Sequence, residues 1–261
     1  DGYRVESYAA EPSPPNAINE KAIVDAQAVG DAVRRAVKRS GARSNEVAVA
    51  ISGDAAITKI IQMPRNLRDA ELESQVEMQA DQYIPFPMEE VSYDFEVIGP
   101  SEKDPEMLDV LLVATRSENV EQRQASVQAA GLAARIVDVE AFALENACRL
   151  LTHQMPDGGM DRNIAVIDFG ASSTTFSVLR DLKVTYTRDF TFGGQQLTEE
   201  IMRTYGLSME EAGRAKKEGG LPANYQSEVL DPFIDDMCQQ VSRSLQFYLA
   251  SGSGREQPEQ I

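Results

Sequence analysis

The residues best suited to chemistry lie in the stretch Asn163–Val178, where an apolar run ends in an acid and a turn of small residues follows. Asp168 comes directly after this run, where a buried strand leaves the core, and a carboxylate there needs a cation or a donor. Gly170 permits close backbone approach, and the small residues after it can turn their amide N–H groups toward an anion. A carboxylate for hydrated Mg²⁺ beside amides for phosphate is the donor set of a nucleotide site. The predicted phosphate-binding residues are Gly170, Ala171, Ser172 and Ser173, with Asp168 holding Mg²⁺ through water.

An ordinary polar hairpin turn is the alternative interpretation, because glycine and serine are common turn formers and aspartate commonly ends a strand. The following segments favour the nucleotide site. A third strand-like run, Lys183–Phe190, leads into Gly193-Gly194 and then into a helix that begins near Gln195. Neither glycine has a Cβ, so the pair predicts either a contact with a nucleotide or a strand-to-helix turn.

The order strand, turn, strand, turn, strand, Gly-Gly, helix resembles the phosphate-loop meander of the actin/Hsp70/FtsA superfamily. Within it the chain resembles the PilM family of actin-like proteins of type IV pilus assembly, most closely over Gln79–Val91. The resemblance implies an α/β, actin-like (ribonuclease H-like), two-lobed ATPase fold with an FtsA-like inserted subdomain. It also implies that ATP with Mg lies between the lobes.

The resemblance suggests further site residues. Relatives commonly carry an acid and a lysine one helical turn apart beside the ribose and adenine. Lys216 keeps the lysine position here, but Gly213 stands at the acid position, so Glu210 or Glu211 would have to replace it. At the entrance of the helix that connects the lobes, Glu140 or Asp138 is a candidate to orient the attacking water. The alternative is that the carboxylate has no catalytic role and lies at the helix start because the helix dipole favours a negative charge there.

Together with the resemblance, the predicted segments suggest four parts, of which the second is the inserted subdomain that the resemblance implies. Residues 1–45 with 132–152 form the first-lobe core, 46–131 the inserted α/β subdomain, 153–162 an interlobe loop and 163–261 the second lobe. Tyr3–Ala9 alternates like a strand, and Gln260-Ile261 suggests the start of another. The superfamily's first phosphate motif and its adenosine loop do not occur in these 261 residues. We therefore expect both ends of the fold to be missing. Other periodicities predict helices over 25–40, 68–82, 118–130, 141–151, 195–205, from 208, and 228–250, and strands over 46–51, 57–61, 91–98, 107–115 and 133–139.

The composition is that of a globular chain, with 42% hydrophobic and 26% charged residues and a net charge of −17. This charge argues against binding to nucleic acid or to anionic lipid, and no apolar stretch reaches the roughly 20 residues of a spanning helix. Cys148 and Cys238 lie in apolar helical patterns, which predicts two buried free thiols. The single histidine, His153, makes a catalytic triad or a multi-histidine metal site a poor hypothesis.

The function that the resemblance implies is an ATP-binding cytoplasmic adaptor of the type IV pilus inner-membrane platform, needed for twitching motility. It would bind the N-terminal cytoplasmic tail of a PilN-like membrane protein, and pilus motor ATPases are a further suggested partner. The chain would then be peripheral to the inner membrane through its partner, and at most a weak ATPase, since no assured base or arginine finger is present. The alternatives are an actin-fold sugar kinase or phosphatase, and an FtsA-like membrane-tethered filament protein.

Overall fold

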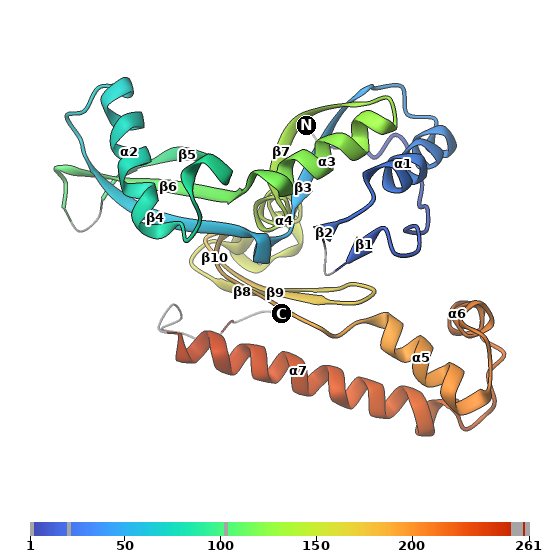
Figure 1. The fold of residues 1–261 in the computed structure, drawn as a ribbon. Helices are drawn as coiled ribbons and strands as arrows, with labels where there is room; N and C mark the ends of the chain where they lie inside the picture. The colour runs from blue at the N-terminus through green and yellow to red at the C-terminus, as the bar shows by residue number, and fades with distance from the viewer. Residues whose placement is uncertain (1–2, 20–21, 102–103, 252–257, 259–261) are drawn as a thin grey trace. The chain divides into compact units, whose positions relative to one another are not determined.

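The computed structural model describes residues 3–19, 22–101, 104–251 and 258 (Figure 1). The chain forms two compact units, Asp1–Ala143 and Leu144–Ile261, and the division falls within helix α4. In the first unit the elements are β1 (Ile18–Asn19), β2 (Ala22–Ile23), α1 (Ala26–Ser40), β3 (Glu46–Ile51), β4 (Ala56–Pro64), α2 (Asp69–Tyr83), β5 (Val91–Pro100), β6 (Met107–Arg116), α3 (Ser117–Ala129), β7 (Ala133–Val139) and the start of α4 (Glu140–Arg149).

One part of the first unit is a three-stranded antiparallel sheet of order β4-β6-β5 with α2 packed on one face. Alternate residues of β6, such as Val110 and Leu112, are fully buried against Val76 of α2. Pro85 and Pro87 prevent α2 from continuing, and Phe86 between them lies under the Arg116 guanidinium, 4.2 Å from ring centroid to Cζ. The run Gln79–Val91 is therefore a helix end, a rigid corner and a strand start.

A second part of the first unit pairs β3 with β7 in parallel and packs α1 against α3. Asp25 caps α1 by accepting from the Ala28 amide, and Gly41 ends it at φ 72°. Gly30 allows the close approach of the two helices, because a Cβ there would lie 2.6 Å from the Ala129 Cβ. The division inferred from the sequence grouped β3 and α3 with the inserted subdomain. In the structure β3 pairs with β7 and α3 packs on α1, and the bounds of an inserted subdomain stay a prediction.

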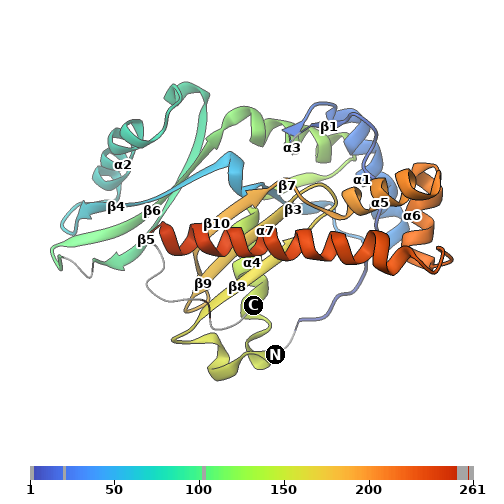
Figure 2. The ribbon, with the colours of Figure 1, turned by 90° about the horizontal axis from the view of Figure 1, so that it is seen from below.

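The second unit contains an antiparallel sheet of β10 (Lys183–Phe190), β9 (Thr174–Arg180) and β8 (Asn163–Phe169), in this order, with helix α7 (Asp231–Ala250) packed on it. Figure 2 shows α7 running across the three strands, and the buried Tyr248 of α7 packs on Phe176 and Val178 of β9. Leu197, Ile201, Ala212 and Val229 form a separate core between α5, α6 and the segment before α7. The elements are β8 (Asn163–Phe169), β9 (Thr174–Arg180), β10 (Lys183–Phe190), α5 (Gly194–Tyr205), α6 (Met209–Glu218), a π-helical turn (Gln226–Leu230) and α7 (Asp231–Ala250).

Three expectations from the sequence differ from the structure or cannot be compared with it. Tyr3–Ala9 is not a strand, because no described strand pairs with it, and Tyr3 and Val5 are more than 80% exposed. Cys148 is buried as expected, but the expectation for Cys238 is wrong: it is exposed and belongs to none of the hydrophobic clusters among the described residues. The strand suggested at Gln260-Ile261 lies outside the described residues.

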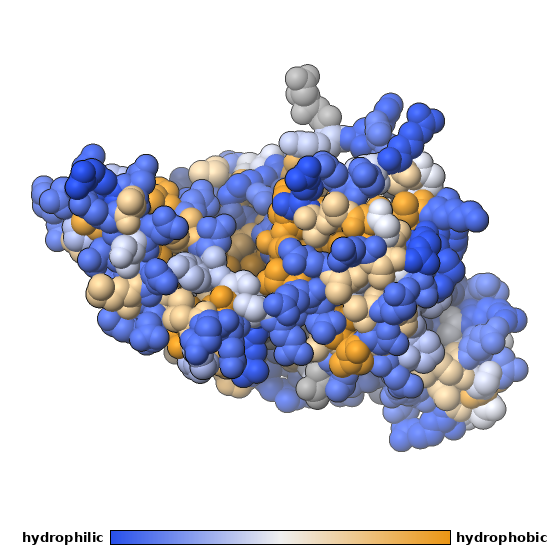
Figure 3. Space-filling view, turned by 45° about the horizontal axis from the view of Figure 1, so that its top comes forward, coloured by the Kyte–Doolittle hydropathy of each residue, from blue (hydrophilic) through white to orange (hydrophobic). Residues whose placement is uncertain are grey.

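The surface agrees with a strongly charged chain. On the face drawn in Figure 3, hydrophilic residues predominate and hydrophobic residues form smaller patches between them. Among the described residues, no helix is both long enough and apolar enough to span a membrane.

Candidate functional site

The predicted hairpin turn connects β8 to β9 within the second unit. The Gly170 N–H donates to the Ser173 carbonyl at 3.0 Å, which closes the turn. Asp168, Gly170, Ala171 and Ser172 are exposed, and Ser173 is half-buried. The strand therefore leaves the core at Asp168, as the sequence predicted, and presents its carboxylate beside the turn.

The turn is attached to the start of α5 by two backbone hydrogen bonds. The Gly194 N–H donates to the Gly170 carbonyl at 3.0 Å, and the Gln195 N–H donates to the Ala171 carbonyl at 2.8 Å. The first amides of a helix have no partner inside the helix, so the turn satisfies two of the α5 donors.

These two bonds determine which way the turn's own amides point. In a trans peptide the C=O of one residue and the N–H of the next point in opposite directions, and the described chain contains no cis peptide. Since the carbonyls of Gly170 and Ala171 face α5, the N–H groups of Ala171 and Ser172 point away from it. Within the described residues, the amides of Ala171, Ser172 and Ser173 donate to no protein acceptor. Successive outward amides of this kind form a small anion-binding concavity.

Two glycines are required by the packing of this turn. A Cβ on Gly170 would lie 2.7 Å from the Ser173 carbonyl oxygen, and a Cβ on Gly193 would lie 2.5 Å from that of Ala171. A Cβ on Gly194 would lie 3.5 Å from the Lys216 Nζ and 3.9 Å from the Gly170 carbonyl oxygen, which are ordinary contact distances. The structure thus gives Gly193 a contact with the hairpin backbone, which the sequence could not distinguish from a contact with a nucleotide.

A row of polar side chains crosses the sheet next to the turn. Asp168 pairs in register with Thr175, and Thr175 pairs with Asp189, so the three side chains share one face. The Thr175 hydroxyl donates to the Asp189 carboxylate. Neither Thr175 nor Asp189 was predicted as a site residue. The signal that could have indicated them is the alternation of β9 and β10, which places every second residue on one face. Among the described residues, no group of three or more acids, histidines or cysteines could hold a metal ion directly.

Lys216 reaches from α6 to the first turn of α5. Its Nζ donates to the Gly194 carbonyl at 2.6 Å and to the Thr198 hydroxyl at 2.7 Å. Burial lowers the pKa of Lys216, and the neighbouring Lys217 adds to this effect. Lys216 therefore contacts the start of α5, to which the hairpin is attached, and its predicted place beside the sugar and base of a nucleotide stays a prediction.

Glu210 and Glu211, the two candidates to replace the missing acid at Gly213, both have partners within α6 or its cap. Glu211 accepts from the Ser208 amide and hydroxyl in a capping box, which lowers the pKa of its carboxyl. Glu210 pairs with Arg214 on the exposed surface. Gly213 lies within α6, and a Cβ there would meet no atom within 4 Å.

The two candidate catalytic acids belong to the first unit. Glu140 is the first residue of α4, and the Asp138 carboxylate accepts from the Val139 N–H at 2.7 Å. Both positions suit a carboxylate at a helix start. Their part in catalysis stays a prediction.

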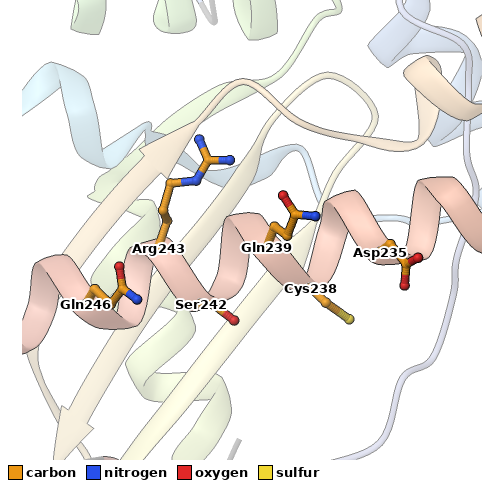
Figure 4. Close-up of a pocket in the computed structure, with 6 residues that line it drawn as sticks. All are labelled: Asp235, Cys238, Gln239, Ser242, Arg243 and Gln246. Carbon is orange, nitrogen blue, oxygen red and sulfur yellow. The ribbon is translucent and has the colours of Figure 1, made fainter.

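Two hollows in the second unit share no residue with the hairpin. One, of about 480 Å³, follows the surface of α7, and all the residues that line it come from this helix (Figure 4). Arg243 and Gln239 extend to one side of the helix and Ser242 and Cys238 to the other. The second hollow, of about 500 Å³, lies between Tyr205, the outer side of α6 and Gly219–Pro222. Neither brings together groups with an evident chemistry.

Comparisons with known proteins agree with the architecture. The family model described as type IV pilus assembly protein PilM matches residues 1–261. A solved PilM-PilN type IV pilus biogenesis complex is 29% identical, with a TM-score of 0.71, over 93% of this chain and 70% of that chain. The ethanolamine utilization protein EutJ from Carboxydothermus hydrogenoformans is 18% identical, with a TM-score of 0.49, over 89% and 60%.

The fold and the hairpin turn define the class: this is an α/β protein of the actin-like ATPase fold. The chain belongs to the type IV pilus assembly protein PilM family. It is accordingly a type IV pilus assembly protein, as the resemblance of its sequence implied.

Proposed function

We propose that the chain binds the phosphates of ATP at the hairpin turn and acts as a nucleotide-gated adaptor in pilus assembly. The observation that carries this proposal is the orientation of the Ala171 and Ser172 amides, which point away from α5 and have no protein acceptor. An anion is the ligand that such amides bind best, and a polyphosphate offers several oxygens to adjacent donors. The hydroxyls of Ser172, which is exposed, and of Ser173, which is half-buried, lie in the same turn and would add further donors.

Asp168 fits a magnesium ion that is bound through water. Mg²⁺ keeps several waters and uses one or two carboxylates together with substrate phosphates. Asp168 provides one exposed carboxylate at the strand end beside the turn, and Asp189 lies on the same sheet face. When bound, the ion would neutralise phosphate charge. Gly193, Gly194 and Lys216 would support the turn from the side of α5.

The partner of the adaptor would be the short cytoplasmic tail of a PilN-like membrane protein. This follows from family membership and from the similar PilM-PilN complex. The chain would stay on the cytoplasmic side and reach the inner membrane through this tail. Binding of nucleotide would shift the population of conformations that accept the tail, rather than yield a chemical product. Turnover of ATP would be slow, with Glu140 as the candidate that orients water.

Titration calorimetry with Mg·ATP tests the nucleotide site. Asp168→Ala should weaken binding of Mg·ATP, and Gly170→Val should abolish it, because a side chain at 170 collides with the Ser173 carbonyl. The melting temperature of each variant checks that the second unit still folds. Unchanged affinity in a folded Gly170→Val variant would refute the site. Repeating the titration with a synthetic PilN-like tail peptide, with and without ATP, tests the gating.

A further inference from the structure

A continuous chain of hydrogen bonds runs from the Lys216 ammonium to the outward amide of Ser172. Lys216 Nζ donates to the Gly194 carbonyl at 2.6 Å. That carbonyl belongs to the same peptide unit as the Gln195 N–H, which donates to the Ala171 carbonyl at 2.8 Å. The Ala171 carbonyl in turn shares its peptide unit with the Ser172 N–H. Two peptide units therefore lie head to tail between a positive charge and an anion-binding amide.

Peptide units arranged in this way polarise one another. A donor on the carbonyl oxygen draws electron density from the N–H of the same unit, which makes that N–H a stronger donor. A charged donor has the larger effect, because charge-assisted hydrogen bonds are stronger than neutral ones. The effect is directed at Ser172, because the trans peptide sends its N–H away from α5.

We propose that Lys216 is a positioning residue for the phosphate turn, which it polarises through Gly194 and Ala171 without touching the ligand. This inference rests on the proposed function, and it assigns Lys216 to the phosphates of the ligand rather than to its sugar or base. The lysine holds the first turn of α5 through Gly194, and α5 holds the hairpin.

The surroundings of Lys216 agree with this role. Two of its three donor positions are occupied by the Gly194 carbonyl and the Thr198 hydroxyl, and Thr198 is itself buried. Thr198 also donates to the Gly194 carbonyl, at 3.1 Å, so the ammonium and the hydroxyl meet at the same peptide unit. The adjacent Lys217 is exposed, and the structure shows no hydrogen bond from it to a described residue. Lys217 is therefore a matched control with the same charge on the same helix.

The test compares Lys216→Met and Lys217→Met in binding to Mg·ATP and to Mg·tripolyphosphate, which has neither sugar nor base. Lys216→Met should weaken both ligands by a similar factor, roughly fivefold for loss of one charge at this range. Lys217→Met should change either affinity less than about twofold, because its exposed charge is screened. If Lys216→Met weakened the binding of Mg·ATP but not of Mg·tripolyphosphate, Lys216 would act on the sugar or base, and the proposal would be overturned. If Lys216→Met and Lys217→Met weakened binding equally, the effect would come from the net charge of the helix rather than from the hydrogen-bond chain, which would also overturn the proposal.

A second measurement needs no ligand. The Ser172 amide proton, observed by nuclear magnetic resonance in the free chain, should shift upfield in Lys216→Met and stay unchanged in Lys217→Met. Lys216→Gln keeps a neutral donor without the charge and should give an intermediate shift. It also provides the test if Lys216→Met does not fold. An unchanged Ser172 signal in folded Lys216→Gln would overturn the proposal. If the wild-type chain binds neither ligand, the proposed function fails, and this signal still decides whether the lysine acts on the turn.

Discussion

At the scale of single residues, two adjacent glycines have different reasons to be glycine. Gly193 is extended, at φ −172°, so its backbone suits any residue, and only the nearby hairpin excludes a side chain. A side chain on Gly194 would meet the Lys216 Nζ and the Gly170 carbonyl oxygen at ordinary contact distances, so the packing there does not require glycine. The sequence shows two equivalent glycines, because the approach of the hairpin to α5 is a tertiary contact without a local pattern.

Replacing these glycines one at a time should separate the two roles. Gly193→Ala should reduce the affinity for Mg·ATP at least tenfold, because a Cβ at 2.5 Å from the Ala171 carbonyl must push the turn away. Gly194→Ala should bind within about threefold of wild type, since both contacts of the new Cβ are of ordinary van der Waals length. Calorimetry measures both, and equal losses in the two variants would contradict the packing argument.

The carboxyl of Glu211 gives a second prediction at this scale. Hydrogen bonds from Ser208 lower the pKa of this carboxyl. The capping box therefore stabilises α6 fully at pH values above the ordinary pKa of a glutamate carboxyl. This contribution is lost as the pH falls through the lowered pKa. A titration followed by nuclear magnetic resonance should find the Glu211 pKa below 4.5, and Ser208→Ala should raise it toward that value. Identical titration curves in wild type and variant would refute the capping box.

At the scale of elements, the sequence predicted the segments well where hydrophobic period and capping residues agree. Helix α1 begins at the Asp25 cap and ends at Gly41 as expected, and strands β8 to β10 lie where their patterns place them. The wrong predictions concern which strands pair with one another. Tyr3–Ala9 has the alternation of a strand but no described strand to pair with, and β3 pairs with the distant β7. Strand pairing depends on residues far along the chain, so a local pattern cannot supply it.

Helix α6 contains a glycine that its packing does not require. Gly213→Ala should raise the free energy of unfolding by about 1 kcal/mol, because alanine loses less backbone entropy in a helix. A Cβ there meets no atom within 4 Å, so no strain offsets the gain. Urea denaturation measures the change. A destabilised Gly213→Ala variant would show that the space beside α6 is needed, and Gly206→Ala, at φ 66°, is the destabilising control.

At the scale of the whole molecule, composition and family membership constrain what the chain contacts. A net charge of −17 repels nucleic acid and anionic lipid, and a PilM family chain is expected near the membrane through a partner. Both properties, the repulsion from anionic surfaces and the recruitment through a partner, could be predicted from the sequence, because net charge and family motifs can be read from it directly. It could not predict the contacts between turn and helix that orient the phosphate-binding amides.

Membrane recruitment tests this view of the molecule. The chain should remain in the supernatant when sedimented with anionic vesicles at physiological salt, and it should sediment with the same vesicles when they display a PilN-like tail. Vesicles that display a scrambled tail are the control. Sedimentation with bare anionic vesicles would contradict the argument from charge.

The unequal exposure of the two cysteines has a practical consequence. Cys148 is buried, and burial raises the pKa of its thiol, whereas Cys238 is exposed on α7. A maleimide dye should therefore attach once to the native chain and twice after denaturation, as intact mass would show. The wild-type chain thus provides a built-in labelling position on its longest helix, from which fluorescence could follow the response of the second unit to nucleotide without any engineered change.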